Sequence, residues 1–178
     1  MLKKILMFFA AALVVLCGVI AMQPGTYKVT RNAEVAAPPA DVFPLINDFH
    51  KWDGWSPWAK IDPNMKTTFS GADSGNGASY YWIGNDEVGE GRMTILESVA
   101  PQLIKIKLDF LKPFASTAIT DFTVMPSGYG SKVEWTMSGD SNFMSKAVCL
   151  FMGGMDKMIG PDFEKGLKQM KALAEKKP

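Results

Sequence analysis

Residues 103–110, LIKIKLDF, alternate apolar side chains with lysine and aspartate. Successive side chains of a β-strand point to opposite faces of the sheet, so this period of two predicts a strand with one apolar and one solvated face. Residues 132–137, KVEWTM, alternate in the same way. Such strands are typical of an antiparallel sheet that has one face in water.

Further strands are expected on both sides of this stretch. Glycine-containing turns at 75–77, 89–91 and 127–130 separate runs rich in β-branched and aromatic residues. The predicted strands lie at 27–35, 67–70, 79–83, 92–99 and 117–125. A short helix is expected to begin near Pro39, and Pro44 limits its length. Residues 49–63, FHKWDGWSPWAKIDP, are predicted to form a loop.

The apolar spacing changes to that of a helix after Asn142. One predicted stripe consists of Met144, Val148, Phe151, Met155 and Met158. Gly160 and Pro161 are expected to interrupt the helix before a second apolar run, which consists of Phe163, Leu167, Met170 and Ala174. These stripes should pack on the apolar face of the sheet. The predicted fold class is therefore α+β, with a curved antiparallel sheet of about six or seven strands around a long C-terminal helix.

The N-terminus has the pattern of a membrane segment. Lys3 and Lys4 precede the uncharged run 5–22, whose 18 residues are at the short end of the range that spans a bilayer. A secretory signal cleaved after Ala21 is the alternative. The two lysines should keep the N-terminus cytoplasmic and place the domain on the periplasmic or extracellular side. The chain divides into an anchor or signal segment, 1–24, and a domain, 25–178.

Charge and composition argue against several kinds of partner. Removing the first 22 residues leaves 17 basic and 18 acidic groups, so the domain lacks the basic surface that nucleic acid requires. Cys17 and Cys149 lie in separate predicted helices, and no CxxC spacing or cysteine–histidine cluster is present. His50 is the single histidine. We therefore expect no metal, no cofactor and no catalytic triad.

Several short motifs occur in an order that is typical of a known superfamily. The matching segments are 37–43 (APPADVF), Trp52 with 55–58 (WSPW), 89–93 (GEGRM), 108–114 (LDFLKPF), Phe163 and 166–167 (GL). Over about 27–175 the sequence resembles the START-like (SRPBCC) superfamily, in its polyketide cyclase/dehydrase-type branch. The resemblance implies a helix-grip fold with an internal cavity for apolar ligands such as lipids, sterols or polyketides. It does not imply one reaction, because fold alone does not fix function.

Aromatic side chains and methionines are the candidates for the lining of such a cavity. The tryptophans of the 49–63 loop either cap its mouth or plug the end of the core, and the methionines of the C-terminal helix either face a ligand or fill the core. The candidate ligand-binding residues are Trp52, Trp55, Trp58, Tyr80, Trp82, Met93, Ile106, Leu108, Phe110, Phe122, Trp135, Met137, Phe151 and Met155.

Two ionisable residues are candidates for acid–base chemistry. Strand parity places Glu97 beside Ile95 and Val99 on an apolar face, where its pKa would be raised, unless a bulge turns it outward. His50 lies beside the tryptophan loop and is either exposed or available for proton transfer.

Three functions are consistent with these patterns. The favoured one is a membrane-tethered binding module for an apolar small molecule or lipid. A polyketide cyclase or dehydratase would instead require Glu97 or His50 in the cavity. A protein-interaction module at the membrane would use the sheet edge or an exposed patch around the tryptophan loop.

Overall fold

The computed structural model describes residues 1–176, so residues 177–178, the end of the predicted domain 25–178, lie outside the described residues. Along the chain the helices and strands are α1 (Leu2–Ala21), β1 (Thr26–Val35), α2 (Pro39–Asn47), the 3-10 helices η1 (Phe49–Gly54) and η2 (Trp58–Lys60), β2 (Lys66–Gly71), β3 (Ala78–Ile83), β4 (Glu90–Val99), β5 (Leu103–Lys112), β6 (Ser116–Ser127), β7 (Gly130–Asp140), α3 (Phe143–Met152) and α4 (Met155–Ala174).

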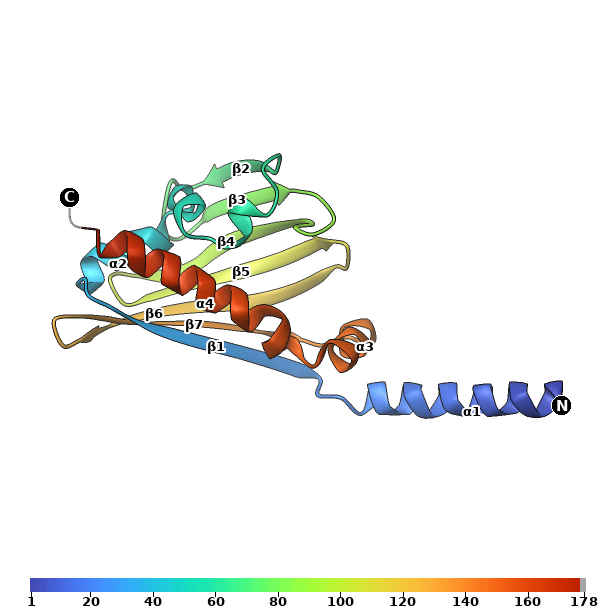
Figure 1. Ribbon diagram of the computed structural model, residues 1–178. Coiled ribbons are helices and arrows are strands. Elements are labelled where there is room, and N and C mark those ends of the chain that lie inside the picture. The colour runs from blue at the N-terminus through green and yellow to red at the C-terminus, as the bar shows by residue number, and fades with distance from the viewer. Residues whose placement is uncertain (177–178) are drawn as a thin grey trace.

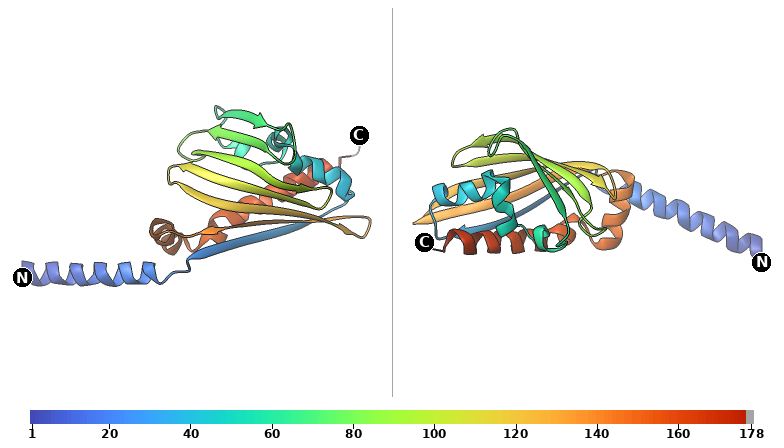
Figure 2. Two further views of the ribbon diagram at one scale, coloured as in Figure 1. Left: turned by 180° about the vertical axis from the view of Figure 1, so that it is seen from behind. Right: turned by 90° about the horizontal axis from the view of Figure 1, so that it is seen from above.

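The seven strands form one antiparallel sheet in the order β1-β7-β6-β5-β4-β3-β2. The first strand pairs with the last, and β2 forms the opposite edge. The sheet curves around α4, which lies in its concave side together with α2 and the 3-10 helices (Figures 1 and 2). The predicted α+β class and helix-grip architecture are confirmed, and each predicted strand lies within one of the observed strands.

Helix α4 approaches the sheet closely because small residues lie at the contact. Phe163, Leu167 and Met170 are buried against the sheet. A β-carbon at Gly166 would lie 2.9 Å from the Trp135 ring, and one at Gly160 would overlap the Arg31 guanidinium. The two glycines therefore set how near α4 can lie to the strands.

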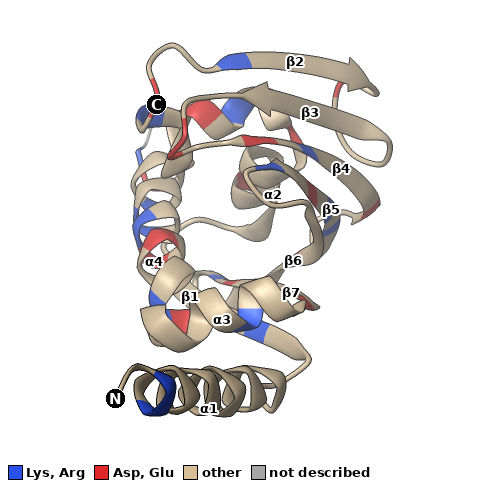
Figure 3. Ribbon diagram, turned by 90° about the vertical axis from the view of Figure 1, so that its right-hand side faces the viewer, with Lys and Arg blue, Asp and Glu red and all other residues tan. Residues whose placement is uncertain are grey.

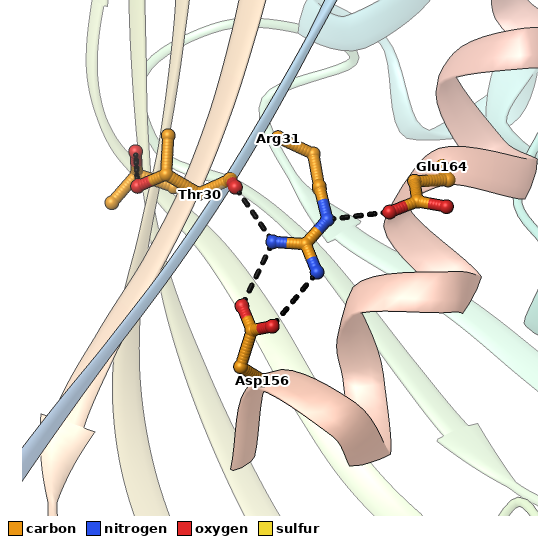
Figure 4. Close-up of polar contacts among 5 residues, drawn as sticks. Thr30, Arg31, Asp156 and Glu164 are labelled. Atoms are coloured by element: carbon orange, nitrogen blue, oxygen red, sulfur yellow. Dashed lines mark hydrogen bonds and ion pairs between the residues drawn. The ribbon is translucent and has the colours of Figure 1, made fainter. Parts of the chain in front are cut away.

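An ion-pair cluster joins β1 to α4 (Figure 4). Arg31 donates hydrogen bonds of 2.8 and 3.0 Å to the two carboxylate oxygens of Asp156, and one of 2.7 Å to Glu164. The guanidinium also donates to the backbone oxygen of Thr30 at 2.9 Å. Hydrogen bonds from Arg31 hold the pKa of Asp156 below its ordinary value. Arg31 shares its strand face with the half-buried Ala33 and buried Val29, and the two carboxylates explain its presence there.

The C-terminal helical region breaks at a different place from the one predicted. Gly153 and Gly154 have φ angles of 83° and 100°, and they end α3 before α4 begins. Glycine adopts this left-handed backbone without steric penalty, which makes it the common residue after a helix C-terminus. Pro161 lies inside α4, in its second turn, where its ring removes one backbone hydrogen bond without ending the helix. The expectation of a single stripe from 144 to 158 is therefore wrong.

The outward reading of Glu97 is confirmed. The β4–β5 register shifts between Ile95 and Glu97, which is the signature of a β-bulge. The side chain of Glu97 is 49% exposed and lies 3.8 Å from the Lys105 ammonium. Strand parity alone placed it on the apolar face because the bulge is not visible in the alternation.

Helix α1 extends away from the domain beyond the start of β1 (Figure 1). It is the one helix within residues 1–176 that is long and apolar enough to cross a membrane. Charge occurs only at its N-terminal end (Figure 3). Ile20 is its single buried residue, near the point where α1 contacts α3. The apolar helix that the sequence predicts is thus present, and it is suited to serve as an anchor or a signal segment.

Candidate ligand-binding site

A cavity of about 200 Å³ lies between the concave face of the sheet, α4 and the segment that carries η1 and η2. Most of its lining side chains are aromatic, aliphatic or methionine. The lining consists of Trp52, Asp53, Ser56, Trp58, Ala59, Met65, Tyr80, Trp82, Glu87, Val88, Met93, Leu108, Phe110, Thr120, Trp135, Met137, Ile159 and Phe163.

Stacked and edge-on rings form one wall of the cavity. The Trp135 and Phe163 rings are parallel within 6°, with centroids 4.0 Å apart. Trp58 meets both rings edge-on, at 5.9 and 6.4 Å. On the other side, Tyr80 stacks on Trp82 at 6.0 Å. Such mutual contacts fix the rings, so the cavity is preformed and does not depend on a ligand to order its walls.

The buried indole N–H groups are satisfied within the protein. Trp52 donates to the backbone oxygen of Ile46 at 2.9 Å, and Trp82 donates to that of Val88 at 3.2 Å. Trp135 donates to the Thr120 hydroxyl at 2.9 Å. These three tryptophans therefore present ring carbons to the cavity while their polar atoms are paired behind the wall.

Few polar groups remain free for a ligand. Within residues 1–176, neither the Tyr80 hydroxyl nor the Trp58 indole N–H makes a hydrogen bond. Burial, and secondarily the charge of Asp53, raises the pKa of Tyr80 to about 12, so this phenol stays protonated at neutral pH. The carboxylates of Asp53 and Glu87 belong to exposed residues of the lining. The arrangement suits a ligand with an apolar body and one or two polar atoms.

Most of the predicted ligand-binding residues line this cavity: Trp52, Trp58, Tyr80, Trp82, Met93, Leu108, Phe110, Trp135 and Met137. Trp55, Ile106 and Phe122 are fully buried in the core behind the wall, and Met155 is half-buried at the start of α4 without reaching the cavity. Phe151 is 72% exposed on α3, and its predicted place in the cavity is wrong because the break at Gly153 and Gly154 separates α3 from the gripped helix.

The tryptophans of the 49–63 loop differ in their position: one fills the core and two face the cavity. Trp55 plugs the core, and its N–H donates to the backbone oxygen of Leu45 at 2.8 Å. Trp52 and Trp58 face the cavity. Trp55 is buried and Trp58 half-buried, so these two residues do not form the large exposed patch that would favour a protein-interaction role.

Lining residues that sequence reasoning missed come mainly from α4, the loop and the β3–β4 turn. Phe163 and Ile159 carry helical spacing, but periodicity cannot tell a cavity wall from filled core. Thr120 shares a strand face with Ala118 and Phe122, so parity alone would have placed its hydroxyl inside. The others, Asp53, Ser56, Ala59, Met65, Glu87 and Val88, lie in irregular segments or at strand ends, where no period applies.

The two acid–base candidates lie outside the cavity. His50 stacks on Phe69 with centroids 4.1 Å apart, and its Nδ1 lies 2.9 Å from the Asp48 carboxylate. Glu97 is on the outer side of the sheet, as described above. In the described part of the chain no three histidine, cysteine or acidic side chains gather as metal ligands. A wider depression of about 540 Å³ over the ends of β1, β6 and β7 is more open to solvent than this cavity.

A preformed apolar cavity between a curved antiparallel sheet and a long C-terminal helix defines a START-like domain of the hydrophobic ligand-binding or cyclase type. Residues 26–175 match the sequence profile of the family described as polyketide cyclase / dehydrase and lipid transport. The chain belongs to this family, and the resemblance noted from its motifs is confirmed.

Solved structures share the fold at low sequence identity. A truncated norcoclaurine synthase from Thalictrum flavum is 13% identical with a TM-score of 0.64, over 86% of this chain and 96% of that one. Protein MLL2253 from Mesorhizobium loti is 20% identical with a TM-score of 0.59, over 84% and 100%. Protein CV1439 from Chromobacterium violaceum is 20% identical with a TM-score of 0.57, over 86% and 100%. No curated protein sequence matches the chain.

Proposed function

We propose that this protein is a membrane-tethered binding module that holds an apolar small molecule, or one chain of a lipid, in the cavity beneath α4. The observation that carries the proposal is the cavity wall, which consists mostly of aromatic, aliphatic and methionine side chains and whose buried indole N–H groups are paired within the protein. Burying apolar ligand surface against such a wall is favourable by roughly 25 cal/mol per Å².

The size of the cavity limits the ligand. Its volume of about 200 Å³ is below the roughly 300–1,000 Å³ that is usual for drug-sized ligands. A small ring system or part of one acyl chain fits this volume, whereas a complete phospholipid does not. A lipid ligand would therefore keep its head group outside the cavity.

Part of the cavity lining lies toward the end of the domain from which α1 leaves. Strand registers place the start of β1, the end of β7 and the start of β6 side by side, and the end of β5 follows next to them. Met65, Val88, Phe110 and Ile159 are half-buried lining residues at this end or close to it. If α1 spans the bilayer, this part of the lining would therefore be turned toward the membrane surface.

The membrane orientation is part of the proposal. Lys3 and Lys4 stand at the start of α1, and the positive-inside rule keeps that end cytoplasmic. The domain would then lie on the periplasmic or extracellular side. Removal of α1 as a signal segment would release the domain instead of tethering it, and N-terminal sequencing of the mature protein separates the two outcomes.

Native mass spectrometry of the full chain, released from nanodiscs, tests ligand binding. The wild type should carry an adduct with the mass of an apolar molecule or lipid. The filled variant, A59F/L108F, places two larger rings in the cavity and should lose the adduct, whereas the matched outer-face variant, L96F, should retain it. A wild type without an adduct, or an equal adduct on the filled variant, contradicts the proposal.

A cyclase or dehydratase is the second candidate, favoured by the ionisable groups that do line the cavity. Asp53 lies near enough to Tyr80 for its charge to raise the pKa of that phenol, so an acid–base pair is available in place of Glu97 and His50. Turnover of a polyketide-like substrate that is abolished in both D53N and Y80F would support this function. Binding that both variants retain, with no turnover by the wild type, would exclude it.

A further inference from the structure

Helix α3 is an apolar helix that the domain does not bury. Eight of the ten residues of FMSKAVCLFM are apolar, and none of the ten is buried. Phe143 and Met144 are 51% and 53% exposed, and Phe151 and Met152 are 72% and 60% exposed. Large apolar side chains gathered on one short helix are unusual for a surface in water and mark a contact with another apolar phase or partner.

The helix lies beside the predicted membrane span. α3 contacts α1, and the Lys146 ammonium donates a hydrogen bond of 3.4 Å to the backbone oxygen of Ala21, the last residue of α1. Ile20, the one buried residue of α1, lies at the same end of the span. If α1 crosses the bilayer, this contact places α3 at the level where the span leaves the membrane.

The direction of α3 also fits the membrane surface. In the left view of Figure 2, α3 is seen nearly end-on while α1 is seen from the side, so the two helices cross and do not run parallel. A helix that runs across the end of a membrane span, instead of continuing along it, has a direction compatible with the plane of the interface. The segment 143–152 contains no acidic residue and one basic residue, Lys146. Interfacial helices bury their apolar residues at the boundary between head groups and acyl chains.

A second apolar side chain stands at the same end of the domain. Phe114, in the turn between β5 and β6, is 60% exposed. The pairing of Ala118 with Gly139 places the start of β6 next to the end of β7, which leads directly into α3. Phe114 and the exposed residues of α3 therefore lie around the same end of the sheet, the one that α1 leaves.

We infer that α3 is an interfacial membrane helix, which lies in the surface of the bilayer that α1 crosses and holds the rim of the cavity against that surface. This inference rests on the proposed membrane tether. It adds a second attachment, so the domain would not rotate freely about the segment 22–25, which joins α1 to β1, but would keep its cavity facing the lipids. A lipid chain could then enter the cavity without passing through water.

Single-cysteine probes in the full chain test the inference, with an environment-sensitive fluorophore and nanodiscs that contain spin-labelled lipids as quenchers. In a background of C17A and C149A, F151C and M144C place the probe on α3. Y129C places it in the β6–β7 turn, at the far end of the sheet, where Tyr129 is fully exposed. The native Cys17, kept as the single cysteine in C149A, reports on α1.

The expected result is a blue-shifted emission that lipid quenches at both α3 positions and at Cys17, with an unshifted, unquenched emission at position 129. Quenching at Cys17 alone would overturn the α3 inference and leave the tether intact. A dry but unquenched probe on α3 would show that protein, such as a second copy of the chain, covers the helix, which also overturns it. Absence of quenching at Cys17 would contradict the proposed tether itself.

Discussion

Replacing Thr120 by valine tests whether the cavity wall is held by paired polar groups. Thr120 is 3% exposed, and its hydroxyl donates to the backbone oxygen of Thr136 at 2.9 Å while it accepts the indole N–H of Trp135 at 2.9 Å. Valine keeps the shape but leaves this N–H, on a side chain that is 2% exposed, without its acceptor. An unsatisfied buried donor costs about 1–3 kcal/mol.

A loss of about 2 kcal/mol corresponds to a decrease in Tm of roughly 4–8 °C for a domain of this size. Thermal unfolding of the full chain in nanodiscs, followed by tryptophan fluorescence, measures it. T120S keeps the hydroxyl and should recover most of the lost stability. In a W135F background no N–H remains to be orphaned, so T120V should be less destabilising there. An equal effect of T120V in both backgrounds would refute the reasoning.

Three further predictions concern the ion-pair cluster of Arg31, the cavity wall at Trp82 and the membrane orientation. Because Arg31 lowers the pKa of Asp156, the ion-pair cluster stabilises the fold above the ordinary aspartate pKa of 3.8, and this stabilisation is lost as the pH falls through the lowered value. The Tm of the wild type should therefore decrease more on acidification below about 4 than the Tm of R31M. Parallel curves of Tm against pH would show that the cluster contributes nothing to stability. A β-carbon at Gly91 would overlap the Trp82 ring, so G91A should displace this ring and destabilise the domain by about 1–3 kcal/mol in urea unfolding. An unchanged midpoint would mean that the ring moves freely. An alkaline phosphatase fused to the C-terminus should be active and a green fluorescent protein dark, and the reverse pattern would overturn the proposed orientation.

The strands were predictable because alternation is a local property of the sequence. Most strands of the sheet have one buried and one more exposed side, so the period of two appears in segments such as 103–110 without knowledge of the fold. The bulge before Glu97 could be proposed from the sequence only as an alternative to strict alternation, because it inserts one residue without changing the composition of the strand.

The C-terminal helices show a second limit of sequence patterns. Residues 143–152 have the apolar content of a core helix, yet the two glycines at 153 and 154 detach this segment from α4. The predicted interruption at Gly160 and Pro161 is wrong, because α3 ends at the glycine pair and α4 continues through Pro161. Once α3 is detached, its apolar side chains face outward, which no periodicity analysis can show, since burial depends on what lies opposite.

The apolar and aromatic character of the cavity lining was predictable, but only some of the residues that form it were. Large side chains on the inner face of a sheet are candidates whether they fill the core or line a space, so Phe122 and Trp135 were equivalent before the structure placed one behind the other. Asp53 and Glu87 line the cavity from irregular segments, and their positions depend on the path of the loops. The polar lining therefore required the structure.

Quenching of tryptophan fluorescence by brominated lipid tests the central claim most directly, because all five tryptophans lie in the domain and none lies in α1 or α3. The full chain in nanodiscs that contain a fraction of phospholipid with brominated acyl chains should lose fluorescence as a chain enters the cavity beside Trp82 and Trp135. The filled variant, A59F/L108F, should be quenched much less, and L96F should match the wild type. Equal quenching of the filled variant and the wild type, or no quenching of either, would contradict the account that the cavity receives a lipid chain.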